Sequence, residues 1–289
     1  MHAMTTGSSS GTPGDGSQER AAMARAVNHW RVVLLLRVAL ALVTLGAWEF
    51  SVQWQWLDPF FFSQPSAIYQ QLVSWLAEGT AQGPLWAELL VTMEETVLGF
   101  LIGSMLGILF GIALGRNKLI SDVLSIYIKV ANAIPRVVLG SIFIIMFGLG
   151  MGSKVALAVV MVFFVVFGNA FQGVREADRN LIANAYILGA SKRQVTFTVV
   201  FPSALSWILA SLHVSFGFAL VGAVVGEFLG ARHGIGLLIA TAQGTFNAAG
   251  VFAAMIVLAL VALGAEYLLT TIEIRLLKWR PVQLFEHGT

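Results

Sequence analysis

Residues 89–114 of this chain read LLVTMEETVLGFLIGSMLGILFGIAL, a run in which Glu94 and Glu95 are the only charged residues. A helix needs about 20 apolar residues to cross the roughly 30 Å hydrocarbon core of a bilayer. The run has that length and lacks the alternating pattern of a barrel strand, and lipid offers its backbone no other hydrogen-bond partners. It therefore predicts a membrane-spanning helix whose two glutamates, near one end, still reach water.

Five further apolar stretches predict five further spans, of which the first is short. They are Val32–Trp48, Ile120–Phe147, Val155–Phe171, Ala204–Leu229 and Val251–Ile272. The composition agrees, because 57% of the 289 residues are hydrophobic and only 11% are charged, against roughly a quarter charged in soluble domains. The predicted fold class is therefore an all-α membrane protein, a six-helix transmembrane bundle, and a water-soluble globule is excluded.

The positions of lysine and arginine predict the orientation of the bundle, because cytoplasmic loops carry an excess of both. With a cytoplasmic N-terminus, only Lys154 and Arg232 fall outside. The residues that fall inside are Arg20, Arg25, Arg31, Arg116, Lys118, Arg175, Arg179, Lys192, Arg193, Arg275, Lys278 and Arg280. Both termini are then cytoplasmic, and the long connection at residues 50–88 lies outside while the one at 173–203 lies inside.

Residues 1–30 differ in composition from the remainder of the chain. Thr, Gly, Ser and Pro dominate their first half, so little apolar area is available to offset the entropy of ordering them. We predict a disordered cytoplasmic tail at 1–30, a six-span transmembrane domain at 31–280 and a short cytoplasmic tail at 281–289. A secretory signal is the alternative for the first apolar run, but that run is long for one and Arg37 interrupts it.

The outer connection at 50–88 is rich in aromatic residues, a composition typical of segments at the level of the lipid headgroups. Its aromatic residues include Trp54, Trp56, Phe60, Phe61, Phe62, Trp75 and Trp86. We expect it to anchor the chain at the interface, a docking surface for an external partner being the alternative. The glycine-rich residues 230–250 form a second candidate outer surface, and a segment that dips into the membrane is the other reading.

The inner connection predicts a short amphipathic helix, because its apolar residues recur at helical spacing. These residues are Leu181, Ile182, Ala185, Leu188 and Gly189. Taken alone, such a helix would lie flat on the bilayer. Gly189 permits the close approach of another backbone or side chain, and Pro202 is expected to end the helix that follows.

Residues 181–194 read LIANAYILGASKRQ, with Val199, Phe201 and Pro202 after them. This resembles the cytoplasmic signature of binding-protein-dependent ABC importer permeases: Glu-Ala-Ala, three residues, Gly, nine residues, Ile, one residue, Leu-Pro. By position, the Gly and the Pro of that signature are Gly189 and Pro202. The resemblance implies a type I importer permease fold in which 173–203 is the coupling region.

The resemblance also implies which residues contact a partner ATPase. They are Ala183, Asn184, Ala185, Tyr186, Leu188, Gly189, Ala190, Ser191, Arg193 and Pro202. Ala183 stands where the family has Glu, and Asn184 where it has the first Ala. We therefore expect docking to depend on apolar packing and on Arg193 more than on a carboxylate.

Other motifs favour the permeases for alkanesulfonate, taurine and nitrate. They are Ile134-Pro135, Phe147-Gly148-Leu149-Gly150 with Lys154 after it, Gly226-Glu227, Gly234-Ile235-Gly236 and Leu276-Leu277-Lys278-Trp279-Arg280. The resemblance implies import of a small organic or inorganic anion of this kind. A neutral heterocycle or vitamin precursor is the alternative substrate, since charge counting does not separate the two.

The family implies an assembly in the bacterial inner membrane. Two copies of the chain would enclose the pathway, a cytoplasmic ABC ATPase dimer would drive them, and an extracytoplasmic substrate-binding protein would deliver the solute, with membrane lipid around them. The chain contains no Gly-x-x-x-x-Gly-Lys-[Ser/Thr] phosphate loop, so ATP must be bound elsewhere. We expect no cofactor in this chain, ATP and Mg being bound by the partner ATPase, and no enzyme activity of its own.

Polar groups inside a membrane are candidates for a role in the pathway. The candidates for the pathway or its gate are Asn132, Pro135, Arg136, His213 and Glu227. Pro135 predicts a kink or break in the third span. The alternatives are an ordinary interhelical hydrogen bond for His213 and an interfacial carboxylate in water for Glu227.

Two other classes of membrane protein fit less well. An ion-gradient-coupled secondary transporter would show an inverted repeat with interrupted helices in both halves, and only one interrupted span is evident. An intramembrane enzyme needs a nucleophile with a base or a metal motif, but the chain has no cysteine and no His-Glu-x-x-His. No catalytic residue and no metal ligand are therefore predicted, and a net charge of +2 predicts no nucleic-acid partner.

Overall fold

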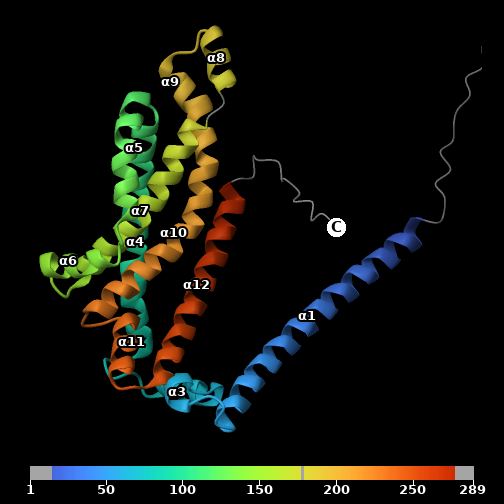
Figure 1. The fold of residues 1–289 in the computed structure, drawn as a ribbon. Coiled ribbons are helices and arrows are strands. Elements are labelled where there is room, and N and C mark those ends of the chain that lie inside the picture. The colour runs from blue at the N-terminus through green and yellow to red at the C-terminus, as the bar shows by residue number, and fades with distance from the viewer. Residues whose placement is uncertain (1–14, 177–178, 277–289) are drawn as a thin grey trace, which may run out of the picture. The chain divides into compact units, whose positions relative to one another are not determined.

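The computed structural model describes residues 15–176 and 179–276, and within these ranges the chain is helical almost throughout and contains no β-strand (Figure 1). The chain divides into two compact units, one ending at Ser66 and the other beginning at Ala67. In chain order the helices are α1 (Asp15–Gln53), α2 (Pro59–Phe62), α3 (Pro65–Ala77), α4 (Leu85–Gly115), α5 (Lys118–Ala133), α6 (Val138–Phe147), α7 (Met151–Arg175), α8 (Arg179–Ile187), α9 (Lys192–Val195), the π-helical segment η1 (Thr196–Val200), α10 (Phe201–Leu229), α11 (Ile235–Gly244) and α12 (Ala248–Leu276).

The helix α1 begins earlier than the sequence analysis predicts. Residues 15–30 are helical rather than a disordered tail, and residues 1–14 lie outside the described residues. The segment from Gln18 to Ala26 consists of Gln, Glu, Arg, Ala and Met, which are all strong helix formers. It adjoins an apolar span that is itself helical, so it extends an existing helix and needs no nucleus of its own.

The first unit closes with local hydrogen bonds at the end of α1. The carboxylate of Glu49 accepts from the Ser66 backbone N–H at 3.0 Å and from its hydroxyl at 2.8 Å. Asp58 caps α2 by accepting from the Phe60 N–H at 2.9 Å. Trp54 and Trp56, which lie in sequence between Glu49 and Asp58, are 61% and 72% exposed. Their placement among lipid headgroups stays a prediction.

Three long helices, α4, α7 and α10, form the centre of the second unit, with α7 in contact with both of the others (Figure 1). Glycines permit this packing. A Cβ atom at Gly107 of α4 would lie 2.9 Å from the Phe167 nitrogen of α7, and one at Gly222 of α10 would lie 2.6 Å from the Ala158 Cα. The stripe of glycines at every fourth position of α4 therefore lets two backbones approach more closely than side chains would allow.

The predicted span at 120–147 is not one continuous helix. It forms α5 and α6, which are separated by Ile134–Val137. Pro135 causes the break, since it has no N–H to donate and disfavours a helical conformation at the residue before it. The chain turns there with short-range bonds, from the Val138 N–H to the Pro135 oxygen and from the Leu139 N–H to the Arg136 oxygen, both 3.0 Å.

The fifth span is longer than predicted. Helix α9, the segment η1 and α10 run on from Lys192 to Leu229 as one apolar helix, so Pro202 does not end a helix as expected. The π-helical turn precedes Pro202, and its wider hydrogen-bond spacing joins the Phe201 N–H to the Thr196 oxygen. Pro202 has no N–H to donate and its ring crowds the carbonyl four residues before it, so a wider turn at this point accommodates the residue within a continuous helix.

Within the described residues five helices are long and apolar enough to cross a membrane. They are Trp30–Gln53, Leu85–Gly115, Met151–Arg175, Lys192–Leu229 and Ala248–Thr271. They correspond to five of the six predicted spans, and the interrupted pair α5 and α6 takes the place of the remaining one. The glycine-rich residues 230–250 contain the short helix α11, whose Ile235 and Leu238 are buried with Leu85 and Ala254.

Candidate functional site

The predicted coupling region forms two short helices at one end of the second unit (Figure 1). Helix α8 ends with the Gly189 N–H on the Tyr186 oxygen and the Ala190 N–H on the Ala185 oxygen, both 3.0 Å. Gly189 has φ +82°, the left-handed conformation that commonly closes a helix and that glycine adopts without strain. A Cβ atom there would meet nothing within 4 Å, so within this chain its backbone conformation, and not a close contact, requires glycine.

Ser191 begins α9 with a capping box. Its hydroxyl accepts from the Gln194 N–H at 3.3 Å, and the Gln194 side chain accepts from the Ser191 N–H at 2.8 Å. Such reciprocal bonds satisfy two backbone donors at a helix start. Ser191 is thus explained by the local structure of the turn, which neither requires nor excludes a partner protein.

The turn between α8 and α9 leaves large apolar side chains in solvent. Ile187 and Leu188 are exposed at 82% and 86%. Ala183, Asn184, Tyr186, Gly189 and Arg193 are also exposed, while Ala185, Ala190 and Pro202 are half-buried. Two neighbouring aliphatic residues so exposed at the tip of a turn are suited to bury themselves against another protein.

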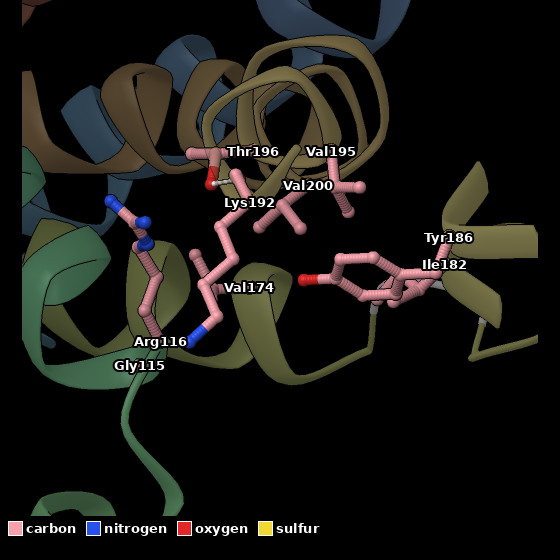
Figure 2. Close-up of a pocket in the computed structure, with 9 residues that line it drawn as sticks. All are labelled: Gly115, Arg116, Val174, Ile182, Tyr186, Lys192, Val195, Thr196 and Val200. Carbon is pink, nitrogen blue, oxygen red and sulfur yellow. Dashed lines mark hydrogen bonds between the residues drawn. The ribbon is translucent and has the colours of Figure 1, made fainter. Parts of the chain in front are cut away.

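The inner face of α8 borders a hollow of about 370 Å³ (Figure 2). Arg116, at the end of α4, and Lys192, on α9, contribute two cations to it, and Tyr186 contributes a hydroxyl. The Tyr186 ring lies on this inner side (Figure 2) and is 47% exposed, and its predicted contact with an ATPase stays a prediction. The coupling region therefore has an apolar outer face and a basic inner one.

A second cluster of polar residues lies buried at the opposite end of α4, α7 and α10. Its members are Glu88 (2% exposed), Thr92 (0%), Glu95 (3%), Lys154 (1%) and Glu227 (0%). The carboxyl groups of Glu95 and Glu227 adjoin each other, and Lys154 is close to both. The Lys154 ammonium also donates to the Leu149 oxygen at 2.7 Å. Buried charges of this kind need partners; three helices contribute them, although Glu95 Oε2 accepts no hydrogen bond from the described residues.

The start of α11 rests on this cluster. The Gly234 N–H donates to Glu88 Oε2 at 2.5 Å and the Gly236 N–H donates to Glu227 Oε2 at 2.6 Å. Between them, the Ile235 N–H donates to the Thr92 hydroxyl at 2.9 Å, which itself donates to Glu227 Oε1 at 2.7 Å. The first N–H groups of a helix have no partners within it, and two carboxylates and a hydroxyl satisfy them here.

The predicted exposure of two of these residues to water is wrong. Glu227 is not an interfacial carboxylate in water and Glu95 does not reach water, since the two are 0% and 3% exposed. Lys154 is 1% exposed, and its assignment to the outer side of the membrane stays a prediction. Glu88 is missed by the sequence analysis. Its spacing from Thr92 and Glu95, four and then three residues, is the signal that would find it, because these positions share one face of a helix.

The remaining pathway candidates are not brought together with Glu227. Pro135 and Arg136 lie in the break between α5 and α6, and the Arg136 guanidinium sits 5.1 Å from the centre of the Phe164 ring on α7. His213 Nε2 lies 3.5 Å from the Thr270 hydroxyl of α12, which is the interhelical contact given as its alternative. The side chain of Asn132 lies outside the described residues. A role for any of them in a pathway stays a prediction.

The chain matches the family model described as "Binding-protein-dependent transport system inner membrane component" over residues 99–278. A Bacillus subtilis (strain 168) permease protein, SsuC, whose name assigns it to aliphatic sulfonates transport, is 33% identical over 68% of this chain and 72% of its own length. The riboflavin transport system permease protein RibX of Chloroflexus aurantiacus is 31% identical over 82% and 87%. The taurine transport system permease protein TauC of Escherichia coli (strain K12) is 29% identical over 86% and 93%.

Solved structures of low sequence identity share the fold. A chain of an amino acid ABC transporter superposes with a TM-score of 0.53 at 19% identity, over 68% of this chain and 92% of that one. A chain of the MetNI methionine ABC transporter in an inward-facing conformation superposes with a TM-score of 0.52 at 18% identity, over 67% and 93%.

Proposed function

This chain belongs to the family of binding-protein-dependent transport system inner membrane components, and from that membership we propose that two copies of it enclose an import pathway for a small sulfonate-like anion. As a permease of a binding-protein-dependent ABC importer, it is a membrane subunit without ATPase chemistry of its own. A separate ATPase hydrolyses ATP, with Mg bound there, and a substrate-binding protein works with it.

The exposed turn between α8 and α9 carries the proposal for coupling. Ile187 and Leu188 are exposed at 82% and 86%, and the positive φ of Gly189 fixes the direction in which they point. A groove on the ATPase would bury both side chains. Helix α9 continues through η1 into α10, so movement of the turn would be carried directly into a membrane span.

The cluster at the other end of α4 and α10 is the candidate gate. Glu227 links α10 to α11 through the Gly236 N–H and to α4 through the Thr92 hydroxyl. A relative shift of α4 and α10 would break these buried bonds, so the cluster favours one arrangement of the outer helix ends. We infer that opening toward the outside requires their rearrangement.

The substrate class rests on the relatives. Permeases named for aliphatic sulfonates and for taurine favour an anion with a sulfonate group. A permease named for riboflavin covers more of this chain than the Bacillus subtilis protein does, so a neutral heterocycle is the second candidate. Uptake of radiolabelled taurine and riboflavin by cells that carry the complete transporter separates the two.

The coupling proposal is tested by purifying the tagged chain from its native membrane with Leu188→Asp beside the parent. Loss of a buried leucine removes about 1.5–3 kcal/mol, so the ATPase subunit should bind at least tenfold more weakly. Leu119→Asp is the matched control, because Leu119 is 76% exposed at the start of α5, where an acidic residue suits a helix N-terminus. Equal ATPase recovery with Leu188→Asp would contradict the assignment of this turn.

A further inference from the structure

Among the described residues that line the hollow beneath α8, both charged side chains are basic. The polar side chains that line it are those of Arg116, Tyr186, Lys192 and Thr196. Within the described part of the chain, neither Arg116 nor Lys192 forms an ion pair. Two cations that share one concave site attract an anion more strongly than the same charges on an open surface.

The polar groups around the hollow come from separate segments. Figure 2 shows the Tyr186 hydroxyl directed across the hollow toward the Lys192 side chain, with Arg116 on the far side of Lys192. The Thr196 hydroxyl is already used, since it donates to the Lys192 backbone oxygen at 2.8 Å. Guanidinium, ammonium and phenol are all donors, and together they match an anion with several acceptor oxygens.

The hollow lies at the level where membrane spans end. Gly115 is the last residue of α4, whose 31 residues form an apolar span, and Val174 is the last but one of α7. Lipid headgroups occupy that level of a bilayer. Basic pockets between spans at the membrane surface bind the phosphate of anionic lipids.

We propose that this hollow binds a phosphate ester, supplied by the headgroup of an anionic phospholipid and held by Arg116, Lys192 and the Tyr186 hydroxyl. The volume of about 370 Å³ accommodates a headgroup. Free phosphate has the same chemistry and is the other source. The site is distinct from the apolar outer face of the turn formed by Ile187 and Leu188.

A bound headgroup joins the coupling region to the membrane spans. Tyr186 lies on α8 and Lys192 on α9, whereas Arg116 follows α4, so one anion bridges all three. The position of α8 then depends on which lipids surround the protein. This consequence rests on the proposed function, but binding of the lipid does not, because it needs neither the ATPase nor transport.

The test is native mass spectrometry of the full chain, stripped of lipid in detergent and titrated with dioleoylphosphatidylglycerol or dioleoylphosphatidylcholine. The parent should bind the anionic phosphatidylglycerol at least fivefold better than the zwitterionic phosphatidylcholine. Arg116→Gln and Lys192→Gln should each lower that preference at least fivefold. Arg275→Gln, which removes one exposed charge near the end of α12 outside the hollow, should leave it unchanged.

Additional variants and a soluble anion complete the design. Lys192→Arg keeps the charge and should keep the preference for phosphatidylglycerol. That result would show that Lys192→Gln loses lipid binding and not folding. Tyr186→Phe removes one donor and should weaken the preference. Sodium phosphate is then added to the parent and to the two Gln variants. Free phosphate would be identified as the source if it displaces the bound lipid and raises the melting temperature of the parent but not of the variants. Equal binding of the two lipids, an undiminished preference in both Gln variants, or the same loss in Arg275→Gln would overturn the site.

Discussion

The Thr92 hydroxyl has partners on two other helices in the interior of the protein, besides the Glu88 backbone oxygen of its own helix at 3.2 Å. It donates to Glu227 and accepts from the Ile235 N–H, and it is fully buried. A single side chain thereby connects α4, α10 and α11. Because its partners are equally shut off from water, their satisfaction depends on this one oxygen.

We predict that Thr92→Val destabilises the chain although valine has nearly the same shape. The change leaves a buried N–H and a buried carboxylate each short of one bond, at about 1–3 kcal/mol per group. Thermal unfolding in detergent should show a melting temperature several degrees lower than that of the parent. Thr96→Val is the control, because the hydroxyl of Thr96 donates only to the Thr92 backbone oxygen of its own helix, and an effect as large there would refute the explanation.

Gly189 allows a test between conformation and contact. Its φ of +82° costs an ordinary L-residue about 1–2 kcal/mol, whereas asparagine tolerates this region better. We predict that Gly189→Ala reduces recovery of the ATPase subunit with the tagged chain more than Gly189→Asn does. The reverse order, in which the larger side chain is the more harmful, would show that close approach of the partner matters more.

Between elements, the spacing of α4 and α7 depends on glycine. A Cβ atom at Gly103 would lie 2.8 Å from the Val159 oxygen, and one at Gly111 would lie 2.7 Å from the Ala170 Cβ. These distances, about two turns of helix apart, are shorter than van der Waals contact. The two helices therefore pack backbone against backbone, and neither can move apart from the other without losing dispersion contacts.

Gly107→Ala should destabilise the second unit, because its new Cβ would lie 2.9 Å from both the Phe167 nitrogen and the Val166 Cβ. Overpacking of this kind costs about 1–3 kcal/mol. Gly168→Ala in α7 is the matched control, since a Cβ there meets nothing within 4 Å and alanine is the better helix former. Melting temperatures in detergent should fall for the first and not for the second; a fall in both would show a general intolerance of side chains at helix glycines.

For the whole molecule, the distribution of basic residues predicts the orientation in the membrane. The turn after α3 and the turn after α8 then face opposite sides. Ala81 in the first is exposed, and Leu188 in the second is 86% exposed. The chain has no cysteine, so a single introduced thiol reports its own position without background.

We predict that Ala81→Cys reacts with a membrane-impermeant maleimide added to spheroplasts, while Leu188→Cys reacts only in inverted vesicles. The reason is that the first lies on the side with few basic residues and the second on the side with many. Labelling after detergent solubilisation is the control for reactivity of each thiol. The opposite pattern would reverse the assigned orientation and with it the assignment of the coupling turn to the cytoplasm.

The sequence by itself determined the helical membrane fold and the short helix that closes with the turn at Gly189. Both are consequences of local order along the chain: apolar runs of bilayer length, the helical spacing around Leu181 and Ala185, and Gly189 at a helix end. Pro135 likewise predicted where the third span breaks. Such features depend on neighbours in sequence, which periodicity describes directly.

Only the tertiary structure decided which residues form the buried cluster and which surround the hollow. Glu88 and Glu227 are 139 positions apart in the numbering, and both meet the start of α11. Arg116 and Lys192 are 76 positions apart and line the same hollow. The sequence pattern around a charged residue near the end of a span is the same whether its side chain faces water or another helix. The packing of α4, α7 and α10 around their glycines settles the difference, because it excludes water and leaves backbone N–H groups as the partners that remain.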